Sequence, residues 1–165
     1  MGGRAYGAAM TTRLRPLSDA DLDAVFRWER DPAAVAMAAF TRADPDDRPA
    51  SDEHYARVRS DPANLLLVVE EDGELVGTAS SFTMEGDREI SYWIDPARWG
   101  RGIASRAVAL LLEADTTRPL HARVAAHNLA SAAVLRKAGF REVGAERSWA
   151  AGLGREVDER IHRLD

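Results

Sequence analysis

Two glycines lie between an extended segment and a helical one in residues 94–109 (IDPARWGRGIASRAVA). Gly100 and Gly102 allow the backbone to approach a ligand closely. The free N–H groups in the first turn of the following helix form an anion site, which the helix dipole strengthens. Further hydrogen-bond donors around this site would come from Arg98, Arg101 and Ser105. We therefore expect a pyrophosphate to bind here, although a helix start with glycines and no ligand explains the segment alone equally well.

Two other phosphate-binding loops do not fit this segment. No Gly-Lys-Ser/Thr follows the glycines, so it is not a Walker loop. It also lacks the third glycine and the later acidic residue of a dinucleotide-binding fingerprint. A general nucleotide-binding α/β domain is therefore a weaker alternative.

Charge and composition narrow the classes of partner and chemistry. The 165 residues carry a formal net charge of −5, which argues against nucleic acid and anionic membrane surfaces as partners. The chain has no cysteine, which excludes a thiol nucleophile, a disulfide and cysteine-ligated zinc. The histidines have no metal-like spacing, so we predict no metal site; they are His54, His121, His127 and His162.

The length of the chain fits one domain. We predict a flexible leader over residues 1–12 and a single domain over residues 13–165. No apolar run approaches the roughly 20 residues that span a bilayer, and residues 1–12 lack the apolar core of a secretory signal. We therefore predict a cytoplasmic protein.

The hydrophobic pattern predicts the elements that position the glycine segment. Residues 65–69 (LLLVV) have no polar face, which predicts an interior strand covered on both sides. Apolar residues at helical spacing from Ile103 onward predict a helix that ends before Pro119. The other strands are expected at 13–17, 75–82, 90–94, 120–124, 140–148 and 157–163, and the other helices at 19–30, 33–40, 51–60 (capped by Ser51) and 128–139, with a loop at 41–49. This order predicts a mixed α/β sheet with helices on both faces.

Two short motifs, residues 99–104 (WGRGIA) and residues 128–140 (NLASAAVLRKAGF), follow one another along the chain. The first is similar to the pyrophosphate loop of the GNAT superfamily of N-acetyltransferases, Gln/Arg-x-x-Gly-x-Gly/Ala, in the variant that begins with Trp. The second is similar to the N-x-x-S…V-L-x-K-x-G-F signature of the branch that contains the ribosomal-protein N-terminal (alanine) acetyltransferases. Residues 89–96 and residues 13–15 also resemble that branch. Two motifs in this order, about 25 residues apart, are more specific than either alone.

The resemblance implies a splayed, mostly antiparallel sheet of six to seven strands with helices on both faces. The sheet would part between strands 89–94 and 120–125, with the pantetheine arm of acetyl-CoA in the gap and coenzyme A as the product. At the cofactor it would place Trp93, Ile94, Arg98, Trp99, Gly100, Arg101, Gly102, Ile103, Ala104, Ser105, Asn128, Ser131, Ala133 and Lys137.

Transfer of acetyl to an amine needs a base for the amine, a backbone N–H for the oxyanion and an acid for the thiolate. The resemblance assigns the acid to Ser131, although its hydroxyl could equally satisfy a backbone N–H at the helix start. Some relatives carry a glutamate where this chain has Ala150, so the base is not carried over. Glu89 is the first candidate for the base. Glu29, Asp31, His54 and water remain open.

The expected activity is direct transfer of acetyl to a primary amine. This amine could be a protein α-amine, a small amine metabolite or an aminated antibiotic. A non-catalytic acyl-CoA sensor of the same fold is the alternative, and a homodimer is possible. Five large side chains are expected either to line a pocket for the acceptor or to belong to the core. They are Trp28, Met37, Phe40, Trp93 and Trp149.

Overall fold

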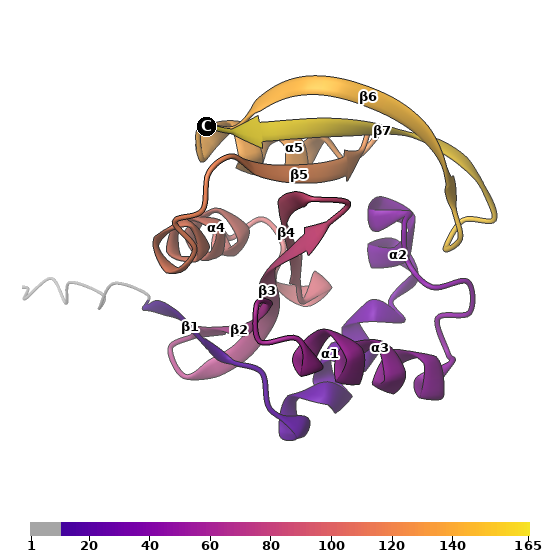
Figure 1. Ribbon diagram of the computed structural model, residues 1–165. Coiled ribbons are helices and arrows are strands. Elements are labelled where there is room, and N and C mark those ends of the chain that lie inside the picture. Colours follow the sequence, from indigo (N-terminus) through magenta and orange to yellow (C-terminus); the bar gives the residue numbers. More distant parts are fainter. Residues whose placement is uncertain (1–10) are drawn as a thin grey trace, which may run out of the picture.

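A computed structural model describes residues 11–165, and within them the framework is a seven-stranded sheet (Figure 1). Across the sheet the strands are β1 (Thr12–Pro16), β2 (Leu65–Glu71), β3 (Glu74–Met84), β4 (Asp87–Ile94), β5 (Leu120–Ala125), β7 (Arg155–Leu164) and β6 (Arg141–Ala150). Only the neighbours β4 and β5 are parallel. This arrangement confirms the mostly antiparallel sheet. The predicted leader falls almost entirely outside the described residues, and Thr12 belongs to β1.

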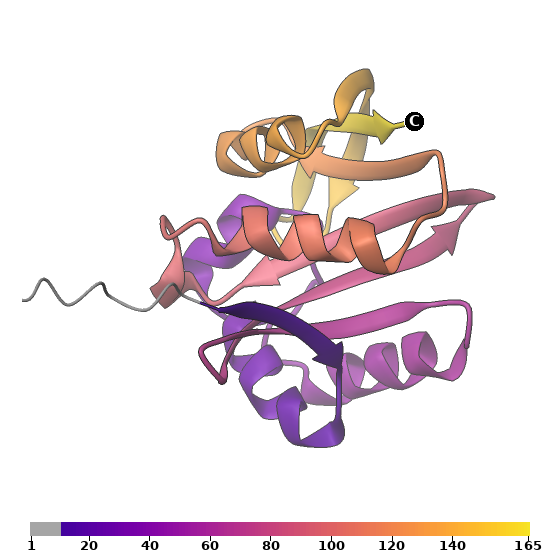
Figure 2. The same ribbon diagram turned by 90° about the vertical axis from the view of Figure 1, so that its left-hand side faces the viewer.

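Helices cover both faces of the sheet. They are α1 (Leu22–Glu29), α2 (Pro32–Ala38), α3 (Arg48–Ser60), α4 (Ile103–Ala114) and α5 (Leu129–Lys137). On one face, α4 and α5 share a core with the central strands, in which Leu111 and Leu135 are fully buried. On the other face, α1 and α3 pack on β2 around Val25 and Val68. Figures 1 and 2 show β2–β4 between α4 and the helices α1–α3, so the strands of the centre are covered on both sides.

The prediction of a loop up to residue 49 and of a helix cap at Ser51 is wrong. α3 begins at Arg48, and the side chain of Asp47 caps it by accepting a hydrogen bond from the N–H of Ala50 at 3.0 Å. Pro49 lies in the first turn, where a missing N–H has no intrahelical partner to lose. Ser51 is buried inside the helix. The helix predicted over residues 19–30 also differs, because it opens with a 3-10 turn at Asp19–Asp21 before α1.

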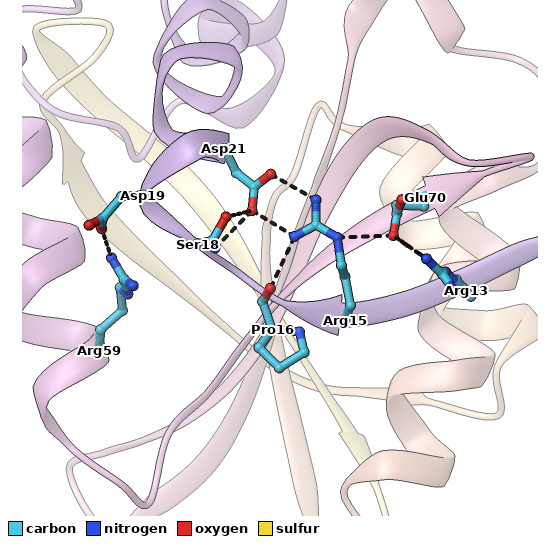
Figure 3. Close-up of polar contacts among 8 residues, drawn as sticks. All are labelled: Arg13, Arg15, Pro16, Ser18, Asp19, Asp21, Arg59 and Glu70. Carbon is cyan, nitrogen blue, oxygen red and sulfur yellow. Dashed lines mark hydrogen bonds and ion pairs between the residues drawn. The ribbon is translucent and has the colours of Figure 1, made fainter.

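A network of charged side chains fastens β1 to this 3-10 turn (Figure 3). Arg15 donates to both carboxylate oxygens of Asp21 at 2.8 Å and to Oε1 of Glu70 at 3.0 Å. The N–H and the hydroxyl of Ser18 also donate to Asp21, at 2.8 and 3.0 Å. The hydrogen bonds from Arg15, opposed by burial, lower the pKa of Asp21 to about 2. The ionised carboxylate therefore stabilises this corner of the fold at neutral pH.

Candidate active site

The two parallel strands at the centre of the sheet part from each other. β4 and β5 oppose only one pair of residues, Glu89 and His121, whereas β3 and β4 stay paired from Gly77–Ile94 to Met84–Asp87. A cavity of about 330 Å³ lies between β4, the start of α4, the start of α5 and α2. Its volume is within the range of small-molecule sites. The parting predicted between these strands is therefore present, with a cavity beside it.

Most of the residues predicted at the cofactor line this cavity. They are Trp93, Ile94, Arg98, Trp99, Gly100, Gly102, Ile103, Ala104, Ser105, Asn128 and Ser131. Three others, Arg101, Ala133 and Lys137, are exposed and do not line it. The lining also contains residues that are not predicted from the sequence as cofactor contacts, namely Ala34, Met37, Ala38, Tyr92 and Ala130. Helix α2 thus forms a wall of the cavity.

The glycine loop has the backbone shape expected of a phosphate cradle. Gly100 and Gly102 adopt positive φ angles of 78° and 74°, which side chains rarely tolerate. A Cβ at Gly100 would meet nothing within 4 Å, so this part of the loop faces open space. The first helical N–H bonded back to the loop is that of Arg106, 3.2 Å from the carbonyl oxygen of Gly102. The preceding N–H groups of α4 are therefore directed outward from the helix start, and the loop fits a diphosphate.

Side chains on both sides hold this loop in place. The indole N–H of Trp99 donates to the carbonyl oxygen of Ile94 at 3.0 Å, which ties the loop to the end of β4. Arg106 donates to the carbonyl oxygen of Arg101 at 3.1 Å and to Oε1 of Glu71 at 3.0 Å. Because the Glu71 side chain is only 1% exposed, this ion pair anchors the loop to the end of β2.

The hydroxyl of Ser131 contacts a tyrosine of β4 that also lines the cavity. The side chain of Asn128 caps α5 by accepting from the N–H of Ser131 at 3.2 Å, so the cap does not use the serine hydroxyl. Oγ of Ser131 lies 2.6 Å from the hydroxyl of Tyr92 on β4. Burial, partly offset by the hydrogen bond to Ser131, raises the pKa of Tyr92 to about 12. Alternation with Ile90 and Ile94 could have placed Tyr92 on the α4 face, but the sequence gives no sign of its partner.

Glu89 lies on the other face of the same strand. Side chains alternate along β4, and Trp93 packs in the core beneath α1 and α3, so Glu89 points to that face. Glu89 is 5% exposed and pairs with Nε of Arg123 at 3.2 Å. It does not line the cavity, but it marks the point where β4 and β5 begin to part. Arg123 also contacts Glu146 at 2.8 Å.

The other candidates for the base are engaged elsewhere. Glu29 accepts from the hydroxyl of Tyr55 at 2.7 Å and pairs with Arg42. Asp31 caps α2, and His54 is exposed on α3. None of the three lines the cavity.

Only some of the aromatic and methionine side chains expected at an acceptor pocket line the cavity. Met37 and Trp93 line the cavity. Trp28 is buried in the core, Phe40 packs in a small cluster, and Trp149 is 64% exposed.

Known proteins share both the sequence pattern and this architecture. The profile of the acetyltransferase (GNAT) domain matches residues 12–141. The chain belongs to the GNAT acetyltransferase family. This GNAT protein is therefore an acetyltransferase. It is similar to the uncharacterized N-acetyltransferase p20 of Bacillus licheniformis, with 28% identity over 171 residues that cover 93% of this chain and 90% of that protein.

Solved structures of other GNAT proteins have the same fold. A ribosomal-protein-alanine N-acetyltransferase of Brucella melitensis is 28% identical, with a TM-score of 0.72 over 92% of this chain and 98% of that one. The spermidine N-acetyltransferase of Vibrio cholerae is 20% identical, with a TM-score of 0.79 over 93% and 94% of the two chains. The Vibrio enzyme was solved in complex with CoA and spermine, so a CoA-type cofactor binds this fold.

None of the helices in residues 11–165 is both long and apolar enough to cross a membrane.

Proposed function

We propose that this GNAT protein transfers the acetyl group of acetyl-CoA directly to a primary amine. The glycine loop with Gly100 and Gly102, called the cradle below, would act on one side of the cavity and Ser131 on the other. The observation that carries this proposal is the cavity itself. It brings together the glycine loop, the start of α4 and the start of α5 beside the point where β4 and β5 part. No cysteine exists to carry the acetyl group as a thioester of the enzyme, which favours direct transfer.

The pyrophosphate of acetyl-CoA would bind the outward N–H groups at the start of α4. Gly100 and Gly102 give the backbone its close approach, and Ser105 adds a hydroxyl at the cavity wall. Asn128 lines the other side, while Ala133 and Lys137 would contact the cofactor outside the cavity. Arg98 lines the cavity and pairs with Glu74 through one terminal nitrogen, which leaves its other N–H groups for a phosphate. The bound cofactor supplies an activated acyl group on a thiol that can depart.

Ser131 would donate a hydrogen bond to the departing sulfur. Ser131 lines the cavity in the first turn of α5, where the positive end of the helix dipole favours a developing thiolate. A backbone N–H near Trp93 and Ile94 would stabilise the oxyanion.

Glu89 would remove the proton of the amine, through a water molecule because the carboxylate does not line the cavity. An unperturbed amine is mostly protonated at neutral pH, with a pKa of about 10.4 for lysine and about 8 for an α-amine, so this step is required. Glu89 and Ser131 flank the gap from opposite faces of the sheet. Attack from the α1–α3 face and departure of sulfur on the α5 side would follow from this arrangement.

The acceptor would be a protein α-amine, a small amine metabolite or an aminated antibiotic. The names of the Brucella and Vibrio relatives support the first two classes. A cytoplasmic location and a possible homodimer stay predictions of the sequence.

A thiol-release screen tests the proposal. Acetyl-CoA is mixed with the protein and with α-amino peptides, polyamines, amino acids or aminoglycosides, and free thiol is measured. We expect release that depends on one class of amine and a matching acetylated product by mass spectrometry. Heat of acetyl-CoA binding without thiol release for any amine would contradict it and would favour the sensor.

A further inference from the structure

Both hydrogen bonds of the Tyr92 hydroxyl go to one residue. Its oxygen lies 2.6 Å from Oγ of Ser131 and 3.2 Å from the main-chain carbonyl oxygen of the same serine. A phenol has one proton to donate and can also accept. In the structure Tyr92 can therefore donate to the carbonyl while it accepts from the serine, or donate to the serine itself.

With two acceptors available, the Tyr92 hydroxyl can redirect its donated hydrogen bond when the Ser131 hydroxyl turns. When the Ser131 hydroxyl turns to a new acceptor in the cavity, its oxygen is free to receive the Tyr92 proton. Hydrogen bonds in such a chain strengthen one another, so the serine becomes a better donor. Because the pKa of Tyr92 is raised, the phenol keeps its proton throughout the neutral pH range.

We propose that Tyr92 is a positioning residue for acetyl transfer, which orients the Ser131 hydroxyl toward the sulfur of the thioester and polarises it as the sulfur departs. This role rests on the proposed function. In that step the amine, which has lost a proton to Glu89 through water, has bonded to the thioester carbon; the oxyanion re-forms the carbonyl, the bond between carbon and sulfur breaks, and its electron pair goes to sulfur. The hydroxyl of Ser131 hydrogen-bonds to the new thiolate, while Tyr92 hydrogen-bonds to Ser131. Neither hydroxyl loses its proton, and the thiolate takes its proton from solvent.

A purely structural role for Tyr92 makes a different prediction. The hydrogen bond to the carbonyl oxygen of Ser131 joins β4 to α5 at the edge of the cavity. If this were its whole purpose, Tyr92→Phe would loosen the cavity walls and weaken acetyl-CoA binding. The turnover number of the saturated enzyme would change little.

The test compares Tyr92→Phe, Ser131→Ala and the double variant by steady-state kinetics, with acetyl-CoA affinity measured by calorimetry. We expect Tyr92→Phe to lower kcat about tenfold, as for one lost hydrogen bond, and to change the KM and Kd for acetyl-CoA less than about twofold. In the Ser131→Ala background, Tyr92→Phe should have no further effect, because the tyrosine acts through the serine.

A matched control is Tyr55→Phe, which removes a buried phenol hydrogen bond to Glu29 outside the cavity. It should lower the melting temperature and leave kcat unchanged. Three outcomes would overturn the role of Tyr92 and leave the proposed function standing. They are an unchanged kcat in Tyr92→Phe, a change confined to KM, and an equal loss of kcat with and without Ser131. Absence of thiol release from the wild-type chain with every amine would overturn the proposed function, and the role of Tyr92 with it.

Discussion

Asp21→Asn removes the carboxylate that links β1 to the turn before α1, and its effect on stability should depend on pH. The side chain is 6% exposed and receives two hydrogen bonds from Arg15 at 2.8 Å. Its pKa is about 2 in the folded chain, against an ordinary value of 3.8. At about 1.4 kcal/mol per pKa unit, this difference corresponds to about 2 to 3 kcal/mol of folding free energy.

Proton linkage sets the direction in which the stabilisation by Asp21 changes with pH. The folded-state pKa is depressed, so the stabilisation is complete above the unfolded pKa and is lost as the pH falls through the folded pKa. About half of it should be gone at about pH 3. Urea unfolding of the wild type and Asp21→Asn at pH 7, 5, 4 and 3 measures the difference, which should narrow toward acid.

Asp19→Asn is the control for this experiment. Asp19 pairs with Arg59 beside the same network (Figure 3), but its side chain is 88% exposed. Exposed pairs contribute about 0 to 1 kcal/mol, so this variant should lose little at any pH. A free-energy difference between wild type and Asp21→Asn that is the same at pH 3 and pH 7 would show that the lowered pKa of Asp21 does not stabilise the fold.

Two further variants test the loop support and the base. Arg106→Leu leaves the carboxylate of Glu71 buried without its cation, so it should lower the free energy of unfolding by about 3 kcal/mol in urea titration. The same change in a Glu71→Gln background should lower the free energy of unfolding clearly less. An equal loss in both backgrounds would contradict the anchoring role of this ion pair. Glu89→Gln should lower kcat at neutral pH by about 100-fold or more with little change in acetyl-CoA affinity, and unaltered turnover would exclude Glu89 as the base.

The parts of the fold with strong local signals could be predicted from the sequence. Residues 65–69 are apolar throughout because strand β2 is covered by helices on both faces. Asn128 and Gly139 mark the two ends of α5, where one caps the first turn and the other takes a φ of 100°. These signals depend on nearby residues only, so the sequence alone carries them.

Features that depend on distant partners could not be predicted. The sequence does not specify the start of α3, because Pro49 suits a loop and a first helical turn equally well. Tyr92 contacts a serine 39 residues later in the chain, so the pair depends on how α5 packs beside β4. The contribution of α2 to the cavity likewise depends on how a short helix packs against the sheet, which its own sequence does not specify.

In the proposed mechanism the backbone amides at the start of α4 bind the diphosphate of acetyl-CoA. Isothermal titration of acetyl-CoA into the wild type, Gly100→Glu, Gly102→Glu and Gly86→Glu measures this binding. Gly86, in the turn between β3 and β4, has a positive φ of 88° and open space around it like Gly100, but it does not line the cavity. We expect binding by the wild type and Gly86→Glu, and at least about 100-fold weaker binding by both cradle variants, because each adds a carboxylate beside the diphosphate. Equal affinity for acetyl-CoA in all four proteins would contradict binding of the diphosphate at the start of α4.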